Sequence, residues 1–247
     1  MACLMNHDCL RFGVVQVMFF ICMSMRVFLL LPLVSQAADP DQVQDFCVAV
    51  LDTSTLGNPI INSGAFPCKP TSEVNSEDFF FDGFRTNNKK GENNTTSNEV
   101  LFGSRLTQGN VLTFPGLNTL GIAMNQVQIS PGGLNPPHLH PRASECGVVI
   151  TGKVLVGFVT SAGNVYYSKN LTKGQMFVIP RGLVHFQMNV GRKNALIYTA
   201  FNSQLPGAVV LPLTLFASNP LIPEEVLTKA FQVDPHILHG IRAKFGA

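Results

Sequence analysis

The sequence of 247 residues lacks tryptophan, and only 13% of its residues are charged, which is a low fraction for a cytosolic domain. The formal net charge is +2, and no cluster of lysine and arginine stands out. Domains that bind nucleic acid carry concentrated positive charge, so we expect no nucleic-acid partner. The hydrophobic fraction of 46% suffices for one domain with a sizeable core.

The N-terminal segment 1–37 differs in composition from the rest of the chain. Arg26 precedes an apolar run over 27–34, and small residues at Ser35 and Ala37 match a signal-peptidase site. Pro32 and the short run argue against a spanning helix, although a second apolar stretch upstream leaves a membrane anchor as the alternative. We therefore predict a secretory signal peptide over 1–37 and no transmembrane anchor after cleavage.

Three of the six cysteines follow this leader: Cys47, Cys68 and Cys146. In an oxidising compartment, Cys47 and Cys68 are candidates for a disulfide that closes a short N-terminal loop. Cys146 lies in an apolar segment, so we predict a buried free thiol there.

Three glycosylation sequons also follow the leader, at Asn93, Asn94 and Asn170. The first two lie in the most polar stretch of the chain, which is typical of an exposed loop. Because they are adjacent, we expect only one of the two to be modified.

Beyond the leader, the chain divides into three zones. Segment 38–115 is rich in turn-forming residues and holds the paired cysteines and the polar loop. Segment 116–215 contains short apolar runs over 148–150, 154–159, 165–168, 176–179, 183–189 and 196–201. Turn residues separate these runs at roughly ten-residue spacing, which predicts an all-β antiparallel sandwich or barrel and excludes a βαβ fold.

The third zone, 216–247, has helical periodicity. Pro223 opens one predicted helix, and Asp234 followed by Pro235 is typical of the start of another. The apolar stripes of these C-terminal helices predict that they cover the barrel or contact a neighbouring subunit.

Four residues carry the chemistry of a metal site. His138 and His140 alternate along a strand and therefore point to the same face. Glu145 opens the next strand after a proline-containing bend. His185 lies inside a short strand that we expect across the barrel from the first. Three imidazoles and one carboxylate would then face inward.

The spacing of these residues is more specific than the residues themselves. It reads G-x5-H-x-H-x4-E-x6-G over 132–152 and G-x5-P-x-G-x2-H-x3-N over 174–189. Both match the two motifs of the cupin superfamily without a gap or substitution. Mixed nitrogen and oxygen ligands without thiolate suit Mn, Fe, Zn, Ni or Cu, and the ligand types alone do not choose among them.

The mature chain also resembles plant germins and germin-like proteins, on segments 45–49, 67–70, 115–121, 201–207 and 212–216. This resemblance implies a single cupin jelly-roll β-barrel with manganese on His138, His140, Glu145 and His185. It further implies a Cys47–Cys68 disulfide, glycosylation near Asn93 and Asn94, secretion to the apoplast or cell wall and a role in plant defence. A homohexamer, built as a trimer of dimers through the C-terminal helices, is implied as well.

The resemblance also bears on activity. In the oxalate oxidases of this family two asparagines near the metal help to hold oxalate, and by motif position these are Asn125 and Asn135. The implied function is an oxidoreductase that produces hydrogen peroxide, from superoxide or from oxalate and O2. Many germin-like proteins lack oxalate oxidase activity, so the alternative is a non-enzymatic apoplastic receptor or cell-wall structural protein that binds manganese without turnover.

Overall fold

A computed structural model describes residues 44–51, 66–85 and 101–246. The chain divides into two compact units, Met1–Gln36 and Ala37–Ala247, and every described residue belongs to the second. The predicted signal peptide over 1–37 and the sequons at Asn93 and Asn94 lie outside the described residues. No helix in the described segments is both long enough and apolar enough to cross a membrane.

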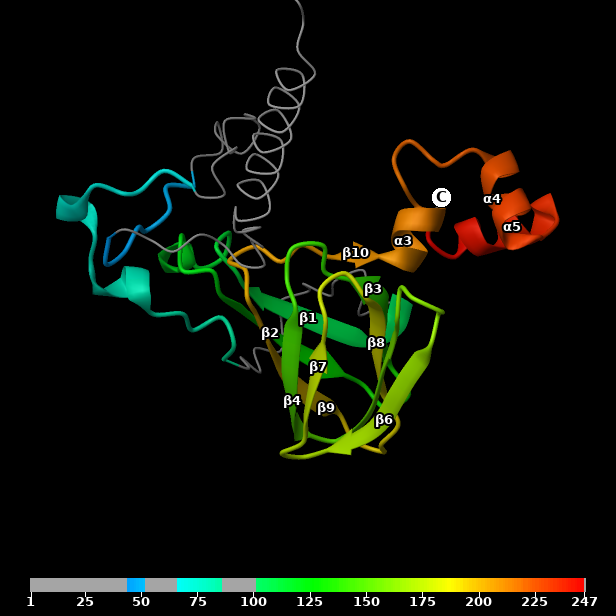
Figure 1. Ribbon diagram of the computed structural model, residues 1–247, viewed down its shortest axis with the longest axis horizontal. Helices are drawn as coiled ribbons and strands as arrows, with labels where there is room; N and C mark the ends of the chain where they lie inside the picture. The colour runs from blue at the N-terminus through cyan, green and yellow to red at the C-terminus, as the bar shows by residue number, and fades with distance from the viewer. Residues whose placement is uncertain (1–43, 52–65, 86–100, 247) are drawn as a thin grey trace, which may run out of the picture. The chain divides into compact units, whose positions relative to one another are not determined.

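Two antiparallel five-stranded sheets form the body of this unit (Figure 1). The first sheet contains, in spatial order, β1 (Ser104–Gly109), β2 (Ala123–Ile129), β9 (Ala195–Phe201), β4 (Glu145–Thr151) and β7 (Met176–Ile179). The second contains β10 (Val209–Val210), β3 (Leu134–Leu139), β8 (Val184–Asn189), β5 (Lys153–Val159) and β6 (Tyr166–Thr172). The predicted all-β fold is confirmed, and the runs read from the sequence correspond to β4 through β9.

Turn chemistry explains where these strands end. Gly152 lies between β4 and β5 with φ of 89°, a left-handed conformation that residues with a Cβ rarely adopt. A Cβ on Gly152 would also lie 2.7 Å from the Cβ of Ala195. The last glycine of the first motif is therefore required by the backbone and by the packing of β9 beside it.

The hydrophobic core fills the space between the two sheets. Strand β9 alternates buried and half-buried residues along its whole length, as a strand with one inward face must. Its Ile197 is fully buried together with Ile129 of β2 and Val149 of β4. Burial of each such side chain contributes roughly 1.5–3 kcal/mol, so the core holds the sheets in the register that positions the polar residues beside it.

Within the described part of the segment before β2 there are three short 3-10 helices, Thr71–Glu73, Ser76–Phe79 and Pro115–Leu117. The Cys47–Cys68 disulfide is present, with sulfurs 2.01 Å apart. Cys146 is a free cysteine as predicted, but the prediction that it is buried is wrong, because it is exposed. Glu145 beside it faces inward, so strand alternation turns Cys146 to the outer face of the sheet. Asn170 is exposed on β6, at the edge of the second sheet.

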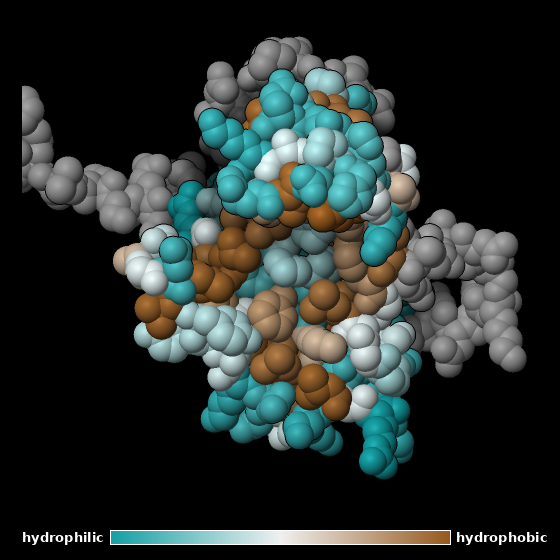
Figure 2. Space-filling model, turned by 90° about the vertical axis from the view of Figure 1, so that its right-hand side faces the viewer, coloured by the Kyte–Doolittle hydropathy of each residue, from teal (hydrophilic) through white to brown (hydrophobic). Residues whose placement is uncertain are grey.

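The C-terminal zone contains α3 (Leu211–Phe216), α4 (Glu224–Phe231) and α5 (Pro235–Ala243). Helix α3 begins at Leu211, before the predicted boundary at 216, directly after the short strand β10. Asp234 and Pro235 start α5 as predicted, although the Asp234 side chain makes no capping hydrogen bond. Figure 2 shows apolar surface gathered below the polar face of these helices.

Candidate metal centre

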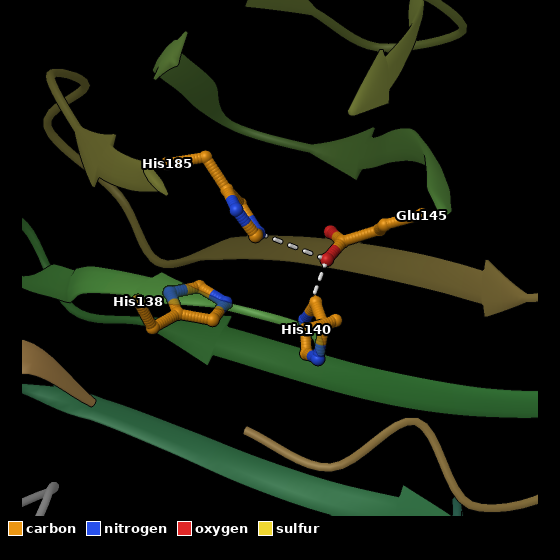
Figure 3. Close-up of side chains that lie close together, drawn as sticks. All are labelled: His138, His140, Glu145 and His185. Atoms are coloured by element: carbon orange, nitrogen blue, oxygen red, sulfur yellow. Dashed lines mark hydrogen bonds and ion pairs between the residues drawn. The ribbon is translucent and has the colours of Figure 1, made fainter. Parts of the chain in front are cut away.

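Three strands bring the four motif residues together (Figure 3). His138 lies in β3, His140 directly follows that strand, His185 lies in β8 and Glu145 opens β4. One ligand atom from each residue lies within 4.8 Å of the other three. All four side chains are buried: His138 and His140 are each 6% exposed, Glu145 is 3% exposed and His185 is 1% exposed.

The relation between the histidine strands differs from the prediction. Strand β8 is the direct neighbour of β3 in the same sheet, and His138 is the cross-strand partner of His185. From the sequence we expected β8 to lie across the barrel from β3. In the structure it is instead Glu145, in β4, that comes from the opposite sheet. Each sheet therefore contributes to the site, and their packing sets the distance between Glu145 and the histidines.

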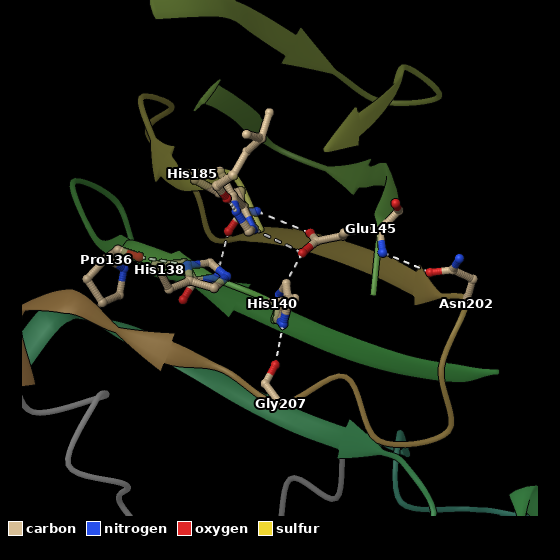
Figure 4. Close-up of polar contacts among 11 residues, drawn as sticks. Pro136, His138, His140, Glu145, His185, Asn202 and Gly207 are labelled. Atoms are coloured by element: carbon tan, nitrogen blue, oxygen red, sulfur yellow. Dashed lines mark hydrogen bonds and ion pairs between the residues drawn. The ribbon is translucent and has the colours of Figure 1, made fainter. Parts of the chain in front are cut away.

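The second ring nitrogen of each histidine is held by the backbone (Figure 4). The Nδ1 atoms of His138, His140 and His185 lie 2.8, 2.5 and 2.9 Å from the carbonyl oxygens of Pro136, Gly207 and Leu183, listed in the same order. A carbonyl oxygen only accepts, so each Nδ1 carries the proton and each Nε2 keeps a lone pair. This is the arrangement that metal-ligating histidines adopt.

The carboxylate of Glu145 faces these lone pairs. Its Oε2 lies 3.0 Å from His140 Nε2 and 3.1 Å from His185 Nε2. The Nε2 of His140 is nevertheless buried without a well-aligned hydrogen bond. Three lone pairs and an ionised carboxylate repel one another in a buried site, and a cation between them removes that repulsion. The donor set thus fits a divalent metal ion.

The pKa values of the site describe the same environment. Burial, and after it the positive charge that a protonated His185 would carry, lower the pKa of His138 to about 3, so its imidazole is neutral and ready to bind a metal. Burial by itself raises the pKa of Glu145, but the hydrogen bonds that protonated imidazoles of His140 and His185 would donate outweigh it and lower the pKa to about 2. Glu145 is therefore ionised at neutral pH.

A cavity of about 130 Å³ opens beside these side chains. Asn125 of β2 and Asn135 of β3 both line it, next to His138, His140 and Glu145. Among the described lining residues there is no lysine or arginine, so a bound metal would be the positive charge nearest to an anionic substrate. The volume suits a ligand of only a few heavy atoms.

A β-bulge explains how Asn135 reaches the same cavity as His138. Their odd spacing would put them on opposite faces of a regular strand. Asn135 and His138 are three positions apart in β3, whereas their partners Gln187 and His185 are two positions apart in β8. The extra residue falls at Pro136 and Pro137, which have no N–H for the ladder, and it turns Asn135 inward.

Two residues near the site were not predicted from the sequence. Gln187 is fully buried in β8, and its Nε2 donates to Glu145 Oε1 at 3.3 Å. The two-residue period after His185 could have indicated its inward direction. The second residue is Gly207, which lies in a loop after β9 with φ of 69°. Its carbonyl oxygen accepts a hydrogen bond from His140 Nδ1. No spacing within the motifs identifies it, because it lies 67 residues from His140.

Comparisons with known proteins agree with this geometry. Residues 88–238 match the cupin family. The chain is 53% identical over 211 residues to germin-like protein subfamily T member 2 of Arabidopsis thaliana, covering 85% of this chain and 88% of the relative. It is 48% identical over 223 residues to oxalate oxidase 2 of Hordeum vulgare, covering 90% and 93% of the two chains.

Solved structures give the same result. The structure of an oxalate oxidase in complex with the substrate analogue glycolate superposes with a TM-score of 0.74 at 46% identity. The match covers 84% of this chain and 98% of that one. With the cupin motifs, the two antiparallel sheets and the buried three-histidine, one-glutamate cluster, these similarities establish that the chain belongs to the cupin family, among the germins and germin-like proteins.

Proposed function

We propose that the protein is a secreted manganese-dependent oxidoreductase that produces hydrogen peroxide, with His138, His140, Glu145 and His185 as the metal ligands. The observation that carries the proposal is the convergence of three Nε2 lone pairs and one carboxylate oxygen in a buried site. The ligand types also suit Fe, Zn, Ni and Cu. We choose manganese among these ions because the chain resembles germins and is similar to oxalate oxidases.

A bound manganese ion would supply one-electron chemistry between its divalent and trivalent states. The four residues would hold the ion, and its remaining coordination positions would be available to small molecules. The three carbonyl contacts hold the imidazoles in place, and Glu145 offsets part of the metal charge. Burial of all four residues keeps bulk water from competing with the substrate.

Two reactions fit this site. In the first, oxalate dianion, O2 and two protons give two CO2 and hydrogen peroxide. In the second, two superoxide anions and two protons give O2 and hydrogen peroxide. Asn125 and Asn135 favour oxalate, because both line the cavity and their amide N–H groups can donate to a small carboxylate. The curated relatives at 48% and 47% identity include oxalate oxidases of barley and wheat, which supports the first reaction.

The test is to assay purified protein for both activities, with and without a chelator, alongside metal analysis. Hydrogen peroxide production that disappears on chelation and returns with MnCl2 supports the proposal. His185→Ala should abolish it, whereas His236→Ala, which changes an exposed histidine of α5, should leave it intact. Protein that retains manganese and shows neither activity refutes the enzymatic function and favours the non-enzymatic alternative.

We further propose secretion to the apoplast or cell wall after cleavage of 1–37, with glycosylation at Asn93 or Asn94 and at Asn170. The disulfide supports an oxidising compartment.

We also propose a homohexamer assembled through the C-terminal helices, and a role in plant defence. Exposed apolar side chains on α4 and α5, at Val226, Phe231 and Ile237, support subunit contact there. Sedimentation of the glycosylated protein, with and without residues 224–247, tests the assembly.

A further inference from the structure

The sequon asparagine Asn170 lies on the outer face of the second sheet. In β6, the strand at the edge of that sheet (Figure 1), Leu171 is buried against the core whereas Asn170 and Thr172 are exposed. Because side chains alternate along a strand, Asn170 and Thr172 point away from the core together. A glycan attached to Asn170 would therefore start on this outer face.

An apolar row of side chains extends from Asn170 across the sheet. The cross-strand partner of Asn170 is Leu155 of β5, and Leu155 pairs on its other side with Met188 of β8. The row ends at Leu134 of β3, the partner of Met188. Met188 is 36% exposed, and the two leucines are half-buried. Since neighbouring strands are about 4.8 Å apart, Met188 lies roughly 10 Å from Asn170, a distance that two sugar rings cover.

A second row beside the first adds aromatic surface. Gly157 of β5 lies opposite Ser168 of β6 on one side and opposite Phe186 of β8 on the other. A Cβ on Gly157 would lie 2.7 Å from the ring of Tyr166 and 3.0 Å from the ring of Phe186. These rings are nearly parallel, with an interplanar angle of 14°. The missing side chain at Gly157 thus makes room for two aromatic rings on the outer face, and Tyr166 is 50% exposed there.

The chemistry of this face suits the first sugars of an N-glycan. A pyranose ring can pack the C–H groups of one face on apolar and aromatic side chains while its hydroxyl groups stay in water. N-acetylglucosamine, with which an N-glycan begins, also has an apolar methyl group. The residues of both rows are uncharged. A glycan that starts at Asn170 can therefore cover them without desolvating a charge.

We propose that an N-glycan on Asn170 packs over Leu155 and Met188 and shields the Met188 thioether from hydrogen peroxide. This inference rests on the proposed function, which includes both the glycan and the peroxide. Peroxide transfers one oxygen atom to the methionine sulfur, which gives methionine sulfoxide and water. Met188 and the ligand His185 lie in the same strand, β8, so a polar sulfoxide would form on a strand that holds the metal. The glycan would protect this strand from the product of the site.

The experiment measures the oxidation of Met188 by added hydrogen peroxide, so it requires no turnover. The protein is produced in a secreting eukaryotic host, and peptide mass spectrometry gives the occupancy of Asn170 and the sulfoxide at each methionine. Asn170→Gln removes the sequon, whereas Thr172→Ser keeps it and is the matched control. Met176, which is 66% exposed in β7 of the other sheet, is the internal reference.

We expect Met188 to oxidise several-fold faster in Asn170→Gln than in wild type or in Thr172→Ser, with the rate at Met176 unchanged. Equal rates at Met188 would overturn the inference, as when a second copy of the chain covers this face instead of the glycan. Wild-type protein without a glycan on Asn170 would overturn it as well.

If Asn170→Gln does not fold, Thr172→Ala decides, because it removes the same glycan and leaves Asn170 in place. Met188 should again oxidise faster than in Thr172→Ser, and equal rates would overturn the inference. Because the peroxide is added, none of these results depends on catalysis. Protein whose glycan shields Met188 but which oxidises neither oxalate nor superoxide refutes the proposed enzymatic function alone.

Discussion

Manganese should raise the melting temperature of the chelated protein by an amount that depends on His185. The ligand atoms already lie within 4.8 Å of one another in the folded chain, whereas an unfolded chain has no such cluster. An ion that binds only the folded state at 100 times its Kd stabilises that state by about 2.7 kcal/mol. For a domain of this size, one kcal/mol corresponds to roughly 2–4 °C, so the expected increase is about 5–10 °C.

The assay is differential scanning calorimetry at one fixed protein concentration, with chelator or with MnCl2. His185→Ala removes a fully buried imidazole and should lower the melting temperature by itself, so the comparison is between the manganese-induced increments. The increment should vanish in His185→Ala and persist in His236→Ala, which changes an exposed residue. An equal increment in wild type and His185→Ala would refute the assignment of His185 as a ligand.

Three further outcomes follow from the geometry. Acid should destabilise the chelated protein: because burial holds the pKa of His138 at about 3, below the ordinary 6.5, unfolding takes up a proton between these values. The urea midpoint should therefore be lower at about pH 4.5 than at about pH 7, and equal midpoints would contradict the burial of a neutral imidazole. Asn125→Ala should retain manganese but raise the KM for oxalate, and unchanged kinetics would remove Asn125 from the substrate site. Replacing both Cys47 and Cys68 with alanine should reduce the unfolding free energy by about 3 kcal/mol, since their separation is 21 residues; an unchanged urea midpoint would contradict this value.

The two-residue period of a strand predicted much of the fold. Short apolar runs separated by turn residues correspond to β4 through β9, because strand propensity and turn chemistry are local properties of the chain. The spacing of His138 and His140 likewise indicated a common direction before any strand pairing was known, and Glu145 was expected at the start of the next strand. The pairing of Cys47 with Cys68 followed from the compartment and from the resemblance to germins.

The tertiary structure decided what local periodicity leaves open. The prediction that Cys146 is buried rested on the apolar composition of its segment, and it is wrong because strand alternation turns Cys146 outward when Glu145 faces inward. The two-residue period does not say which strands pair. Strand β8 therefore lies beside β3, with His138 opposite His185, rather than across the barrel.

The sequence by itself determined which residue types are available to hold a metal and at what spacing they occur. Only the tertiary structure decided how each is oriented. The carbonyl of Gly207 behind His140 and the contact of Gln187 with Glu145 join residues 67 and 42 positions apart. Such contacts depend on the packing of the two sheets, which the buried core sets for the chain as a whole and no short motif encodes.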